Sequence, residues 1–434
     1  MKQERDIVLG LGATGYSVVR HLHTQCPVSV FDSRLGRDAD AIPFLNNVRV
    51  DYPDVDVISP KGYKRALESA RRVIASPGIP LSNSMLKWAQ IERIPVVGDI
   101  DLFMEQVRVP VIGITGTNGK STTVTLVADM LQERGYVACG NIGTPVLDML
   151  KSKATGFVLE LSSFQLERLQ QGPFKVATIL NISKDHLDHH GSMEDYRAAK
   201  QRIYQDAEFA VYDHLRPETV PIKALPGLEL NRDPNWAVLE NGITVDRELI
   251  RQSEIALSGS NYLQNLLTAA AIATQLGASV EDVVRVARAF KGLPHRAQSL
   301  GVFGGVEFIN DSKATNVCAA IASIHEQYAA GSKLILICGG DGKAAGFEEL
   351  GVCIDKFVAH TILFGNDAPS IASCIHRTSY EFVPSMDVAV SVAVNVSQSG
   401  DKVLLAPACA SFDMFTDFAH RGTTFANCVS ELQG

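Results

Sequence analysis

Three glycine-rich turns, each placed directly after a short apolar run, limit what this chain can fold into. The turns follow Leu9, Ile114 and Cys338. Similar apolar runs alternate with helical patterns along the chain, and most of the runs end in Gly, Asp, Ser or another polar residue. The apolar runs are residues 7–10, 28–32, 73–76, 111–114, 157–160, 176–181, 333–338 and 403–406. Strands that are this uniformly apolar are typical of parallel sheets covered by helices on both faces. The pattern therefore predicts an α/β protein in which each glycine-rich turn opens its own unit.

The length agrees with several units. A chain of 434 residues is too long for one ordinary hydrophobic core and suggests about three domains. Turn-rich stretches at 95–99 and 291–295 are candidate boundaries. We expect domains at residues 1–98, 99–297 and 298–434.

Composition excludes several classes of protein. The formal net charge of -8 gives no overall attraction to nucleic acid, so an anionic ligand must be held by a few well-placed groups. The eight cysteines never form a Cys-x-x-Cys pair, which argues against a zinc ribbon or a thioredoxin-like site. The charged first six residues are unlike a signal peptide, and no apolar stretch is long enough to span a bilayer. We expect a cytoplasmic protein.

The first glycine-rich turn matches a dinucleotide-binding fingerprint. Gly10, Gly12 and Gly15 follow a strand, and Asp32 ends the next strand at about the expected distance. The pattern fits NAD, but it fits another nucleotide as well, since glycines and a helix N-terminus accept any pyrophosphate. A bare structural turn is the remaining alternative. Ser33 and Arg34 could hold ribose or phosphate oxygens.

The second turn is a phosphate-binding loop. It reads Gly116, Thr117, Asn118, Gly119, Lys120, Ser121 and Thr122, and it departs from the strict Walker pattern because Ile114 stands where the first glycine belongs. The glycines allow close backbone approach, the lysine reaches terminal phosphates, and a hydroxyl binds Mg²⁺. Glu160, which closes the next strong strand, is a natural further ligand. An ordinary carboxylate at the sheet edge is the alternative for Glu160.

Three histidines follow a further core strand. Asp185 and His186 lie near its end, where catalytic groups of open α/β sheets gather. His189 and His190 suggest zinc at first sight, but no Cys or His-Glu pattern accompanies them, so we expect a solvated loop. Lys200 resembles an exposed helical lysine by its local sequence alone.

In the last third, charged and turn residues follow several strands. Arg296, Asp311, Lys313, Lys343 and Ser411 each stand in such a segment. Singly, each segment could be turn chemistry. Together they predict that the third unit holds a small charged substrate.

Taken together, five of these motifs resemble the Mur ligases of peptidoglycan synthesis. They are the loop at 116–122, Glu160 with the residues up to 165, the pair at 185–186, the stretch 292–296 and the stretch 310–316. The resemblance covers essentially the full chain in colinear order. Within the family, the 310–316 motif is typical of the members that add D-glutamate, and the Asp-Asn-Pro-Arg type of motif of the diamino-acid-adding relative is absent.

The resemblance implies a Rossmann-like UDP-binding domain, a central P-loop ATPase domain and a Rossmann-like C-terminal domain that brings the amino acid. It changes the first fingerprint from NAD to UDP. It also implies an ATP-dependent ligase that joins D-glutamate to UDP-N-acetylmuramoyl-L-alanine through an acyl phosphate, with ATP and two Mg²⁺ ions. We expect a monomer that binds no nucleic acid and does not insert into a membrane.

The family's functional residues carry over position by position. The UDP-sugar would contact Ala13, Thr14, Asp32, Ser33, Arg34, Ser76, Gly78, Asn141 and Ser162. ATP would contact the 116–122 loop, Asn265, Arg296 and Asp311. The metal ligands would be Ser121, Glu160, His186 and Lys200 as a carbamate, and the catalytic set Lys120, Glu160, His186 and Lys200. D-glutamate would contact Lys313, Thr315, Lys343, Ser411 and Phe418.

One departure from the family stands at the end of the central domain. The family usually shows His-Asn-x-x-Asn there, whereas this chain has Tyr262 at the first asparagine and keeps Asn265 at the second. We therefore expect the adenine or ribose contact from Asn265.

Other functions remain as alternatives. Another family member, such as the L-alanine-adding Mur ligase or folylpolyglutamate synthase, would share the ATP loop. An NAD-binding regulator or a P-loop switch would lack ligase chemistry altogether, and such a switch would not need the set of Lys313, Lys343 and Ser411.

Overall fold

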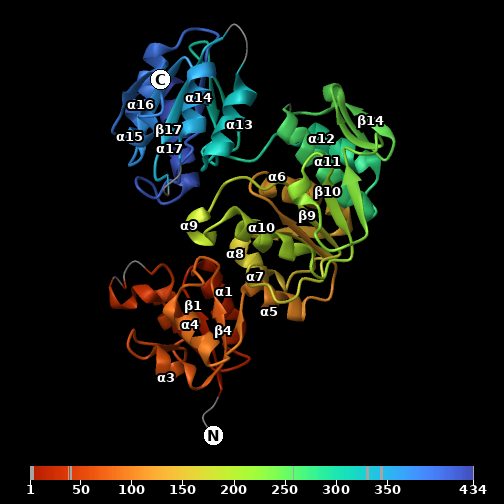
Figure 1. The fold of residues 1–434 in the computed structure, drawn as a ribbon, viewed down its shortest axis with the longest axis vertical. Helices are drawn as coiled ribbons and strands as arrows, with labels where there is room; N and C mark the ends of the chain where they lie inside the picture. The colour runs from red at the N-terminus through yellow and green to blue at the C-terminus, as the bar shows by residue number, and fades with distance from the viewer. Residues whose placement is uncertain are drawn as a thin grey trace. The chain divides into compact units, whose positions relative to one another are not determined.

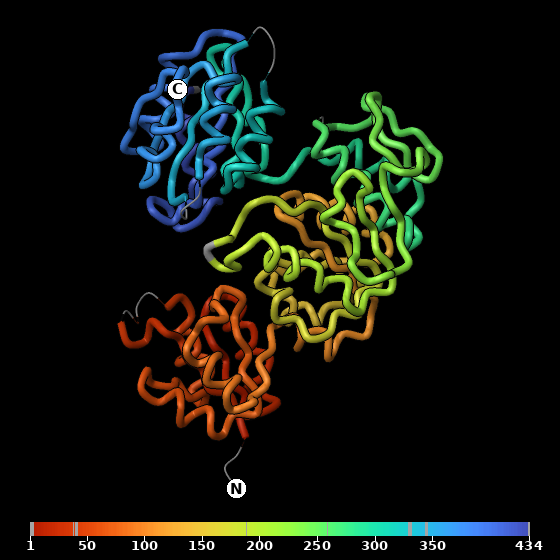
Figure 2. Tube along the Cα trace, in the orientation of Figure 1, coloured from red at the N-terminus to blue at the C-terminus, as the bar shows by residue number. Residues whose placement is uncertain are grey.

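The computed structural model describes residues 4–37, 39, 42–257, 259–328, 332–342 and 346–433. Its contacts divide the chain into two compact units, one of residues 1–182 with 189–290 and the other of residues 183–188 with 291–434. Figure 1 labels the elements and Figure 2 follows the same trace by residue number. The first unit contains two parallel sheets, and the second unit contains one further sheet.

The N-terminal sheet has five parallel strands in the order β3-β2-β1-β4-β5. Its central strand β1 is apolar and buried from Ile7 to Leu9, as a sheet covered on both faces requires. The strands are β1 (Arg5–Leu9), β2 (Val28–Phe31), β3 (Asp56–Val57), β4 (Ala70–Ala75) and β5 (Val96–Val97). The helices are α1 (Ala13–Leu22), α2 (Leu45–Asp51), α3 (Tyr63–Leu67) and α4 (Ser84–Ile91), with a 3-10 turn at Ser33–Gly36.

The central sheet has six parallel strands in the order β11-β10-β9-β6-β8-β7. They are β6 (Val111–Thr115), β7 (Tyr136–Gly140), β8 (Gly156–Glu160), β9 (Val176–Ile179), β10 (Ala210–Asp213) and β11 (Gly227–Leu230). An antiparallel sheet of β12 (Trp236–Leu239), β13 (Gly242–Val245) and β14 (Glu248–Arg251) follows. The helices are α5 (Asp99–Gln106), α6 (Lys120–Met130), α7 (Val146–Met149), α8 (Ser163–Leu166), α9 (Leu187–His190), α10 (Met193–Gln201), α11 (Ser260–Gln275) and α12 (Val280–Ala289).

The C-terminal sheet has the order β15-β16-β20-β17-β18-β19, and only β15 runs antiparallel to its neighbour. The strands are β15 (Gln298–Phe303), β16 (Val306–Asn310), β17 (Leu334–Gly339), β18 (His360–Phe364), β19 (Ser379–Phe382) and β20 (Lys402–Leu405). The helices are α13 (Val317–Gln327), α14 (Glu348–Phe357), α15 (Ala368–Ala372), α16 (Met386–Val396) and α17 (Phe418–Ser430). Separate apolar clusters cover its two faces, one around Leu336 and one around Ile337.

In each parallel sheet, functional candidates follow the carboxyl ends of the strands. β6 leads into the phosphate loop, β8 ends at Glu160, and β1 leads into the turn before α1. This edge is where open α/β sheets bind ligands. The fold therefore places the phosphate loop, Glu160 and the first glycine-rich turn at the carboxyl edges of their sheets.

Candidate functional site

The phosphate loop joins β6 to α6 through a tight backbone path. Gly119 caps α6 in the left-handed region at φ +80°. A Cβ at this position would lie 2.5 Å from Oδ1 of Asn265, so the amide of α11 sits directly against the loop. This close approach explains why a glycine is needed at 119. It also places the predicted nucleotide contact Asn265 beside the loop.

Glu160 accepts hydrogen bonds from the loop and from the end of the neighbouring strand β7. Ser121 Oγ donates to Glu160 Oε2 at 2.5 Å, and Asn141 Nδ2 donates to Oε1 at 2.9 Å. Lys120 Nζ donates to the carbonyl oxygens of Gly116 and Thr117 at 2.8 and 2.7 Å, which holds the ammonium against the loop. Glu160 is 3% exposed. A buried carboxylate beside a hydroxyl offers the oxygen ligands that Mg²⁺ prefers.

Lys200 is buried at the same loop, although its local sequence predicted an exposed residue. Its side chain is on α10 and is 1% exposed. Nζ donates to the carbonyl oxygen of Gly116 at 2.9 Å and lies 4.7 Å from the ring centroid of Tyr196. The structure thus brings Lys200 to the phosphate loop, together with Lys120 and Glu160.

Two residues that we did not nominate from the sequence also support this loop. Asn181, just beyond β9, accepts from the backbone N–H of Asn118 through Oδ1 at 2.9 Å and donates back to its carbonyl oxygen at 3.1 Å. The Tyr196 hydroxyl lies 3.1 Å from Thr117 Oγ1. The position of Asn181 at a strand end was a usable signal, whereas nothing near Tyr196 marks it.

Tyr262, which stands where the Mur ligase resemblance implies an asparagine, is a core residue. Its ring stacks on Phe290 with 6.1 Å between centroids, and 8% of the residue is exposed. Burial raises the pKa of its hydroxyl, which has no hydrogen-bond partner among the described residues. Tyr262 is thus a packing residue, and Asn265 one turn later remains the polar group that faces the loop.

The predicted UDP end is organised by Asp32. Its Oδ2 accepts from the backbone N–H of Leu11 at 3.0 Å, and both carboxylate oxygens accept from the guanidinium of Arg34, at 2.9 and 2.8 Å. Burial alone would raise the pKa of Asp32, but these hydrogen bonds outweigh it and hold the pKa below its usual value. On the other side of the turn, Ser76 Oγ donates to the carbonyl oxygen of Gly10 at 3.0 Å.

The other predicted UDP-sugar residues lie at strand ends or helix starts of the same unit. Ala13 and Thr14 open α1, Ser33 follows Asp32, and Gly78 follows β4 with open space at its Cα. Asn141 follows β7. Ser162 caps α8, and its Oγ accepts from the backbone N–H of Gln165 at 3.2 Å.

In the C-terminal domain, several predicted amino-acid contacts are brought together. Lys313 Nζ lies 3.9 Å from the ring centroid of Phe418. Ser312 Oγ donates to the carbonyl oxygen of Phe418 at 2.8 Å. Arg421, which is fully buried, donates to Ser312 and to the carbonyl oxygens of Cys409 and Ala410. We did not nominate Arg421 from the sequence, although it fixes the segments before Lys313 and Ser411.

The remaining predicted residues of the C-terminal unit are placed as follows. Ser411 is 2% exposed, just beyond the Asp341–Ala410 bridge, and Thr315 precedes α13. Asp311 directly follows β16, and burial raises the pKa of its carboxyl despite the nearby charge of Arg296. Lys343 lies outside the described residues.

His186 belongs to a short segment that groups with the C-terminal unit. Residues 183–188 are part of that unit by their contacts. Asp185 accepts from Asn316 Nδ2 at 3.1 Å and from the backbone N–H of His186 at 2.9 Å. His186 has φ +52°, a left-handed backbone conformation that is uncommon outside glycine. The predicted metal ligand thus stands on a constrained backbone beside the family motif at 310–316.

The expectation that His189 and His190 form a solvated loop is wrong. Their side chains are only 12% and 3% exposed, and both contact Glu167. The sequence interpretation failed because Glu167 lies 22 residues earlier and no local pattern joins it to the histidines.

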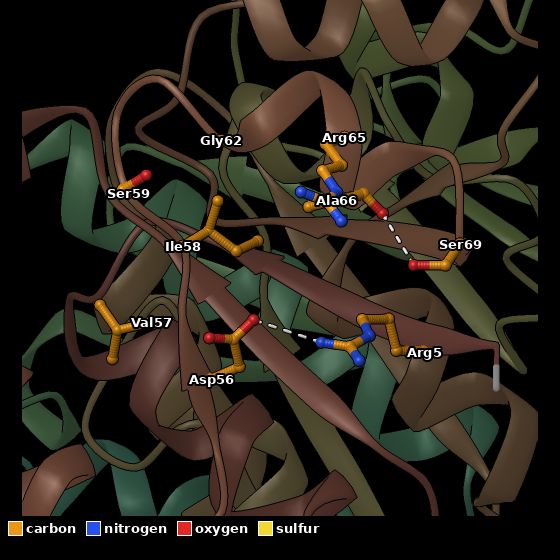
Figure 3. A pocket seen from close by; sticks show the side chains of 9 residues that line it. All are labelled: Arg5, Asp56, Val57, Ile58, Ser59, Gly62, Arg65, Ala66 and Ser69. Carbon is orange, nitrogen blue, oxygen red and sulfur yellow. Dashed lines mark hydrogen bonds and ion pairs between the residues drawn. The ribbon is translucent and has the colours of Figure 1, made fainter. Parts of the chain in front are cut away.

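A cavity of about 480 Å³ in the N-terminal domain does not contain the predicted site. Arg5, Asp56 and Ser69 line it, at the amino ends of β1, β3 and β4 (Figure 3). Arg5 Nη1 donates to Asp56 Oδ2 at 3.2 Å across it. The predicted UDP contacts follow the opposite, carboxyl ends of the strands.

No helix within the described ranges combines the length and apolar character that crossing a membrane requires.

Comparisons with known proteins agree with this geometry. Three family patterns match in order: "Mur ligase MurD-like, N-terminal domain" at residues 4–98, "Mur ligase middle domain" at 114–220 and "Mur ligase, glutamate ligase domain" at 295–409. A UDP-N-acetylmuramoylalanine–D-glutamate ligase of Shewanella oneidensis is 40% identical over 444 residues, which cover 100% of this chain and 99% of the relative. The chain belongs to the Mur ligase family.

Solved Mur ligases share the fold. The UDP-N-acetylmuramate-alanine ligase MurC of Thermotoga maritima matches with a TM-score of 0.63 at 17% identity, over 99% of both chains. A MurF ligase of Thermotoga maritima in complex with ADP matches with a TM-score of 0.60 at 19% identity, over 85% of this chain and 90% of that one. The predicted α/β fold with three Mur ligase domains is confirmed.

Proposed function

We propose that this chain is the ATP-dependent Mur ligase that adds D-glutamate to UDP-N-acetylmuramoyl-L-alanine in peptidoglycan precursor synthesis. The observation that carries this function is the full-length relative named for that reaction at 40% identity. The hydrogen bond of Ser121 to Glu160, and Lys120 held against the loop carbonyl oxygens, support the nucleotide chemistry. An ADP complex of a structural relative supports ATP as the co-substrate.

The reaction proceeds by activation of a carboxylate. A carboxylate oxygen of the L-alanyl group attacks the γ-phosphorus of ATP, and the bond to the β,γ-bridging oxygen breaks to give an acyl phosphate and ADP. The amine of D-glutamate then attacks the acyl carbon, forms a tetrahedral intermediate and loses a proton. Collapse of this intermediate expels inorganic phosphate and leaves the amide.

The chief barrier is charge repulsion, because a carboxylate approaches a triphosphate. Lys120 supplies a fixed positive charge at the loop, and the backbone N–H groups at the start of α6 favour the phosphate oxygens. Ser121 and Glu160 would hold one Mg²⁺, while His186 and a carbamylated Lys200 would hold a second. Bound there, the metal ions neutralise phosphate charge. The burial of Lys200 supports carbamylation, since burial favours the neutral amine that reacts with CO₂.

The remaining residue roles rest on the resemblance and on the placements described above. Asp32 and Arg34 with the 10–15 turn would hold UDP, Asn265 would contact ATP, and Lys313 with Ser411 and Phe418 would hold D-glutamate. We also propose boundaries at 98/99 and 297/298, a monomeric state and a cytoplasmic location.

An amino-acid panel tests the function. Phosphate release is measured with UDP-N-acetylmuramoyl-L-alanine, ATP and Mg²⁺, and with D-glutamate, L-glutamate, L-alanine or diaminopimelate. We expect release with D-glutamate and only background when either the UDP-sugar or the amino acid is omitted. The variant Lys120→Met should abolish release, whereas Lys175→Met, which removes an exposed lysine paired with Glu208, should not. Equal release without D-glutamate would contradict the proposal.

A further inference from the structure

A histidine–carboxylate cluster lies in the central domain, outside the set proposed for catalysis. Glu167 follows α8, and His189 and His190 end α9. His189 Nε2 lies 2.9 Å from Glu167 Oε2 and 3.1 Å from Oε1, and His190 Nδ1 lies 3.7 Å from Oε2. One ligand atom from each of the three residues falls within 4.8 Å of the other two.

The spacing suits a tetrahedral metal ion. Zinc bonds to imidazole nitrogen and carboxylate oxygen are about 2.0–2.2 Å long, so the edges of the tetrahedron are roughly 3.3–3.5 Å. The two nitrogen–oxygen distances of 2.9 and 3.7 Å lie on either side of that value. Small rotations of the side chains therefore suffice to admit the ion. A water molecule would complete the four ligands.

The surroundings hold the ligands in place. The side chains of Glu167, His189 and His190 are 8%, 12% and 3% exposed. Phe164 packs edge-on against the His189 ring at 4.5 Å and stacks on the His190 ring at 5.6 Å, with 12° between the latter planes. The three side chains therefore lose little conformational entropy when an ion binds, which favours a high metal affinity.

A second hydrogen bond of His190 is compatible with the tautomer that a metal requires. His190 Nε2 lies 2.9 Å from Ser163 Oγ. With the proton on Nε2, the ring donates to Ser163 and turns the lone pair of Nδ1 toward Glu167. Metal-bound histidines characteristically donate their other N–H to such a partner, which orients the ring.

A neighbouring arginine pairs with the other carboxylate oxygen of Glu167. Arg168 Nη2 lies 3.4 Å from Glu167 Oε1. The same guanidinium donates to the carbonyl oxygens of Ser76 and Ile79, so it is held on the side of the N-terminal domain. Glu167 Oε2 is the oxygen closest to both histidines and is the one left for the metal.

We propose that Glu167, His189 and His190 form a zinc-class transition-metal site in the central domain. Two imidazole nitrogens beside one carboxylate oxygen suit Zn²⁺ or Co²⁺, whereas Mg²⁺ prefers a shell made mainly of oxygen ligands. The site is separate in its ligands from the one proposed around Ser121 and Glu160, and it does not depend on the proposed function. The His190 ring lies 5.2 Å from the ring of Tyr196, whose hydroxyl contacts the phosphate loop, so the ion would brace that contact.

Zinc titration of the full-length protein tests the site. The protein is stripped with EDTA, desalted and titrated with Zn²⁺ against a chromophoric chelator, with Mg²⁺ in large excess to occupy oxygen-rich sites. We expect one equivalent of tightly bound Zn²⁺, lost in the double variant His189→Gln/His190→Gln and retained in His214→Gln. His214 is the matched control, since its Nδ1 also lies 2.9 Å from a glutamate, Glu229, but on an exposed side chain. Ser163→Ala should weaken binding by about tenfold.

Equal zinc stoichiometry and affinity in the wild type and the double variant would overturn the proposal. Co²⁺ spectra of the unmodified protein give a second readout that needs no variant. The proposal predicts the d–d bands of a tetrahedral nitrogen and oxygen site without thiolate charge transfer. Charge-transfer bands at one equivalent of Co²⁺ would instead assign the metal to cysteines and overturn the site.

Discussion

Ser121 Oγ donates a hydrogen bond to Glu160 Oε2 at 2.5 Å. The hydroxyl comes from the first turn of α6, and the carboxylate ends the neighbouring strand β8. The phosphate loop and the adjacent strand thus present their oxygen atoms at one point. This pair is the structural basis of the metal requirement that we propose.

Removing the hydroxyl should change the magnesium dependence. In Ser121→Ala, one oxygen ligand is lost while the fold of α6 is kept, because alanine is a strong helix former. We expect the Mg²⁺ concentration for half-maximal activity to rise by roughly 10–100-fold. Ser121→Thr restores an oxygen and should recover most of the affinity. A magnesium titration of phosphate release measures the Mg²⁺ dependence of both variants. Identical curves for Ser121→Ala and the wild type would contradict the role of Ser121 as a metal ligand.

Because Asn265 lies so close to Gly119, a single methyl group added at position 119 should weaken ATP binding. In Gly119→Ala, the added Cβ meets Asn265 Oδ1 at 2.5 Å, in addition to the left-handed strain at φ +80°. We expect ATP affinity to fall by at least about tenfold, which corresponds to 1.4 kcal/mol. Gly400→Ala is the matched control, since Gly400 has φ +95° and no atom within 4 Å of the new Cβ.

Both glycine variants should lose about 1–2 kcal/mol of unfolding free energy through backbone strain. Only Gly119→Ala should lose nucleotide binding, as measured by calorimetric titration with ATP. Unchanged ATP affinity in Gly119→Ala would show that the loop does not need this backbone path.

The Tyr196 hydroxyl should contribute modestly to ATP binding at the phosphate loop. Tyr196→Phe removes the 3.1 Å hydrogen bond to Thr117 Oγ1 but keeps the ring beside Lys200. A hydrogen bond of this kind contributes about 1 kcal/mol, so we expect KM for ATP to rise roughly fivefold. Tyr328→Phe, at a side chain that is 44% exposed in the C-terminal domain, should leave KM unchanged. If both variants behave alike, Tyr196 has only a packing role.

Asp99 should make stability fall as pH rises. Burial raises the pKa of Asp99 to about 6 from an ordinary value of 3.8. The folded state therefore favours the neutral carboxyl. Asp99 therefore adds about 3 kcal/mol to the free energy of unfolding below pH 3.8, and this contribution is lost as the pH rises to about 6.

The variant Asp99→Asn isolates this effect. Urea unfolding of the variant and of the wild type is compared between pH 4 and pH 7, so that the other titrating groups cancel in the difference. As the pH rises from 4 to 7, we expect the unfolding free energy of the variant to increase relative to that of the wild type. A difference that does not vary with pH would contradict the raised pKa of Asp99.

Sequence reasoning reached the fold because local and global patterns agree. Uniformly apolar strands and the turns after Leu9, Ile114 and Cys338 predict three α/β domains, and the family comparisons confirm them. The phosphate loop and Glu160 were also predictable, since both lie directly at strand ends. Whether each nominated residue acts as proposed stays a prediction.

Contacts between distant segments could not be predicted in the same way. Lys200 looks like an exposed helical lysine, yet packing of α10 buries it at the loop. Arg421 and the pairing of Glu167 with two histidines depend on segments far apart in the sequence. Only the folded chain brings these groups together, because no periodic pattern links them.

Amide formation through an acyl phosphate moves an oxygen atom from the substrate carboxylate to the released phosphate, and isotope labelling detects that transfer. UDP-N-acetylmuramoyl-L-alanine carrying ¹⁸O in both carboxylate oxygens is incubated with ATP, Mg²⁺ and D-glutamate, and the phosphate released is analysed by mass spectrometry. We expect one ¹⁸O atom in each phosphate formed along with the D-glutamyl amide. Amide formation with unlabelled phosphate would contradict this expectation.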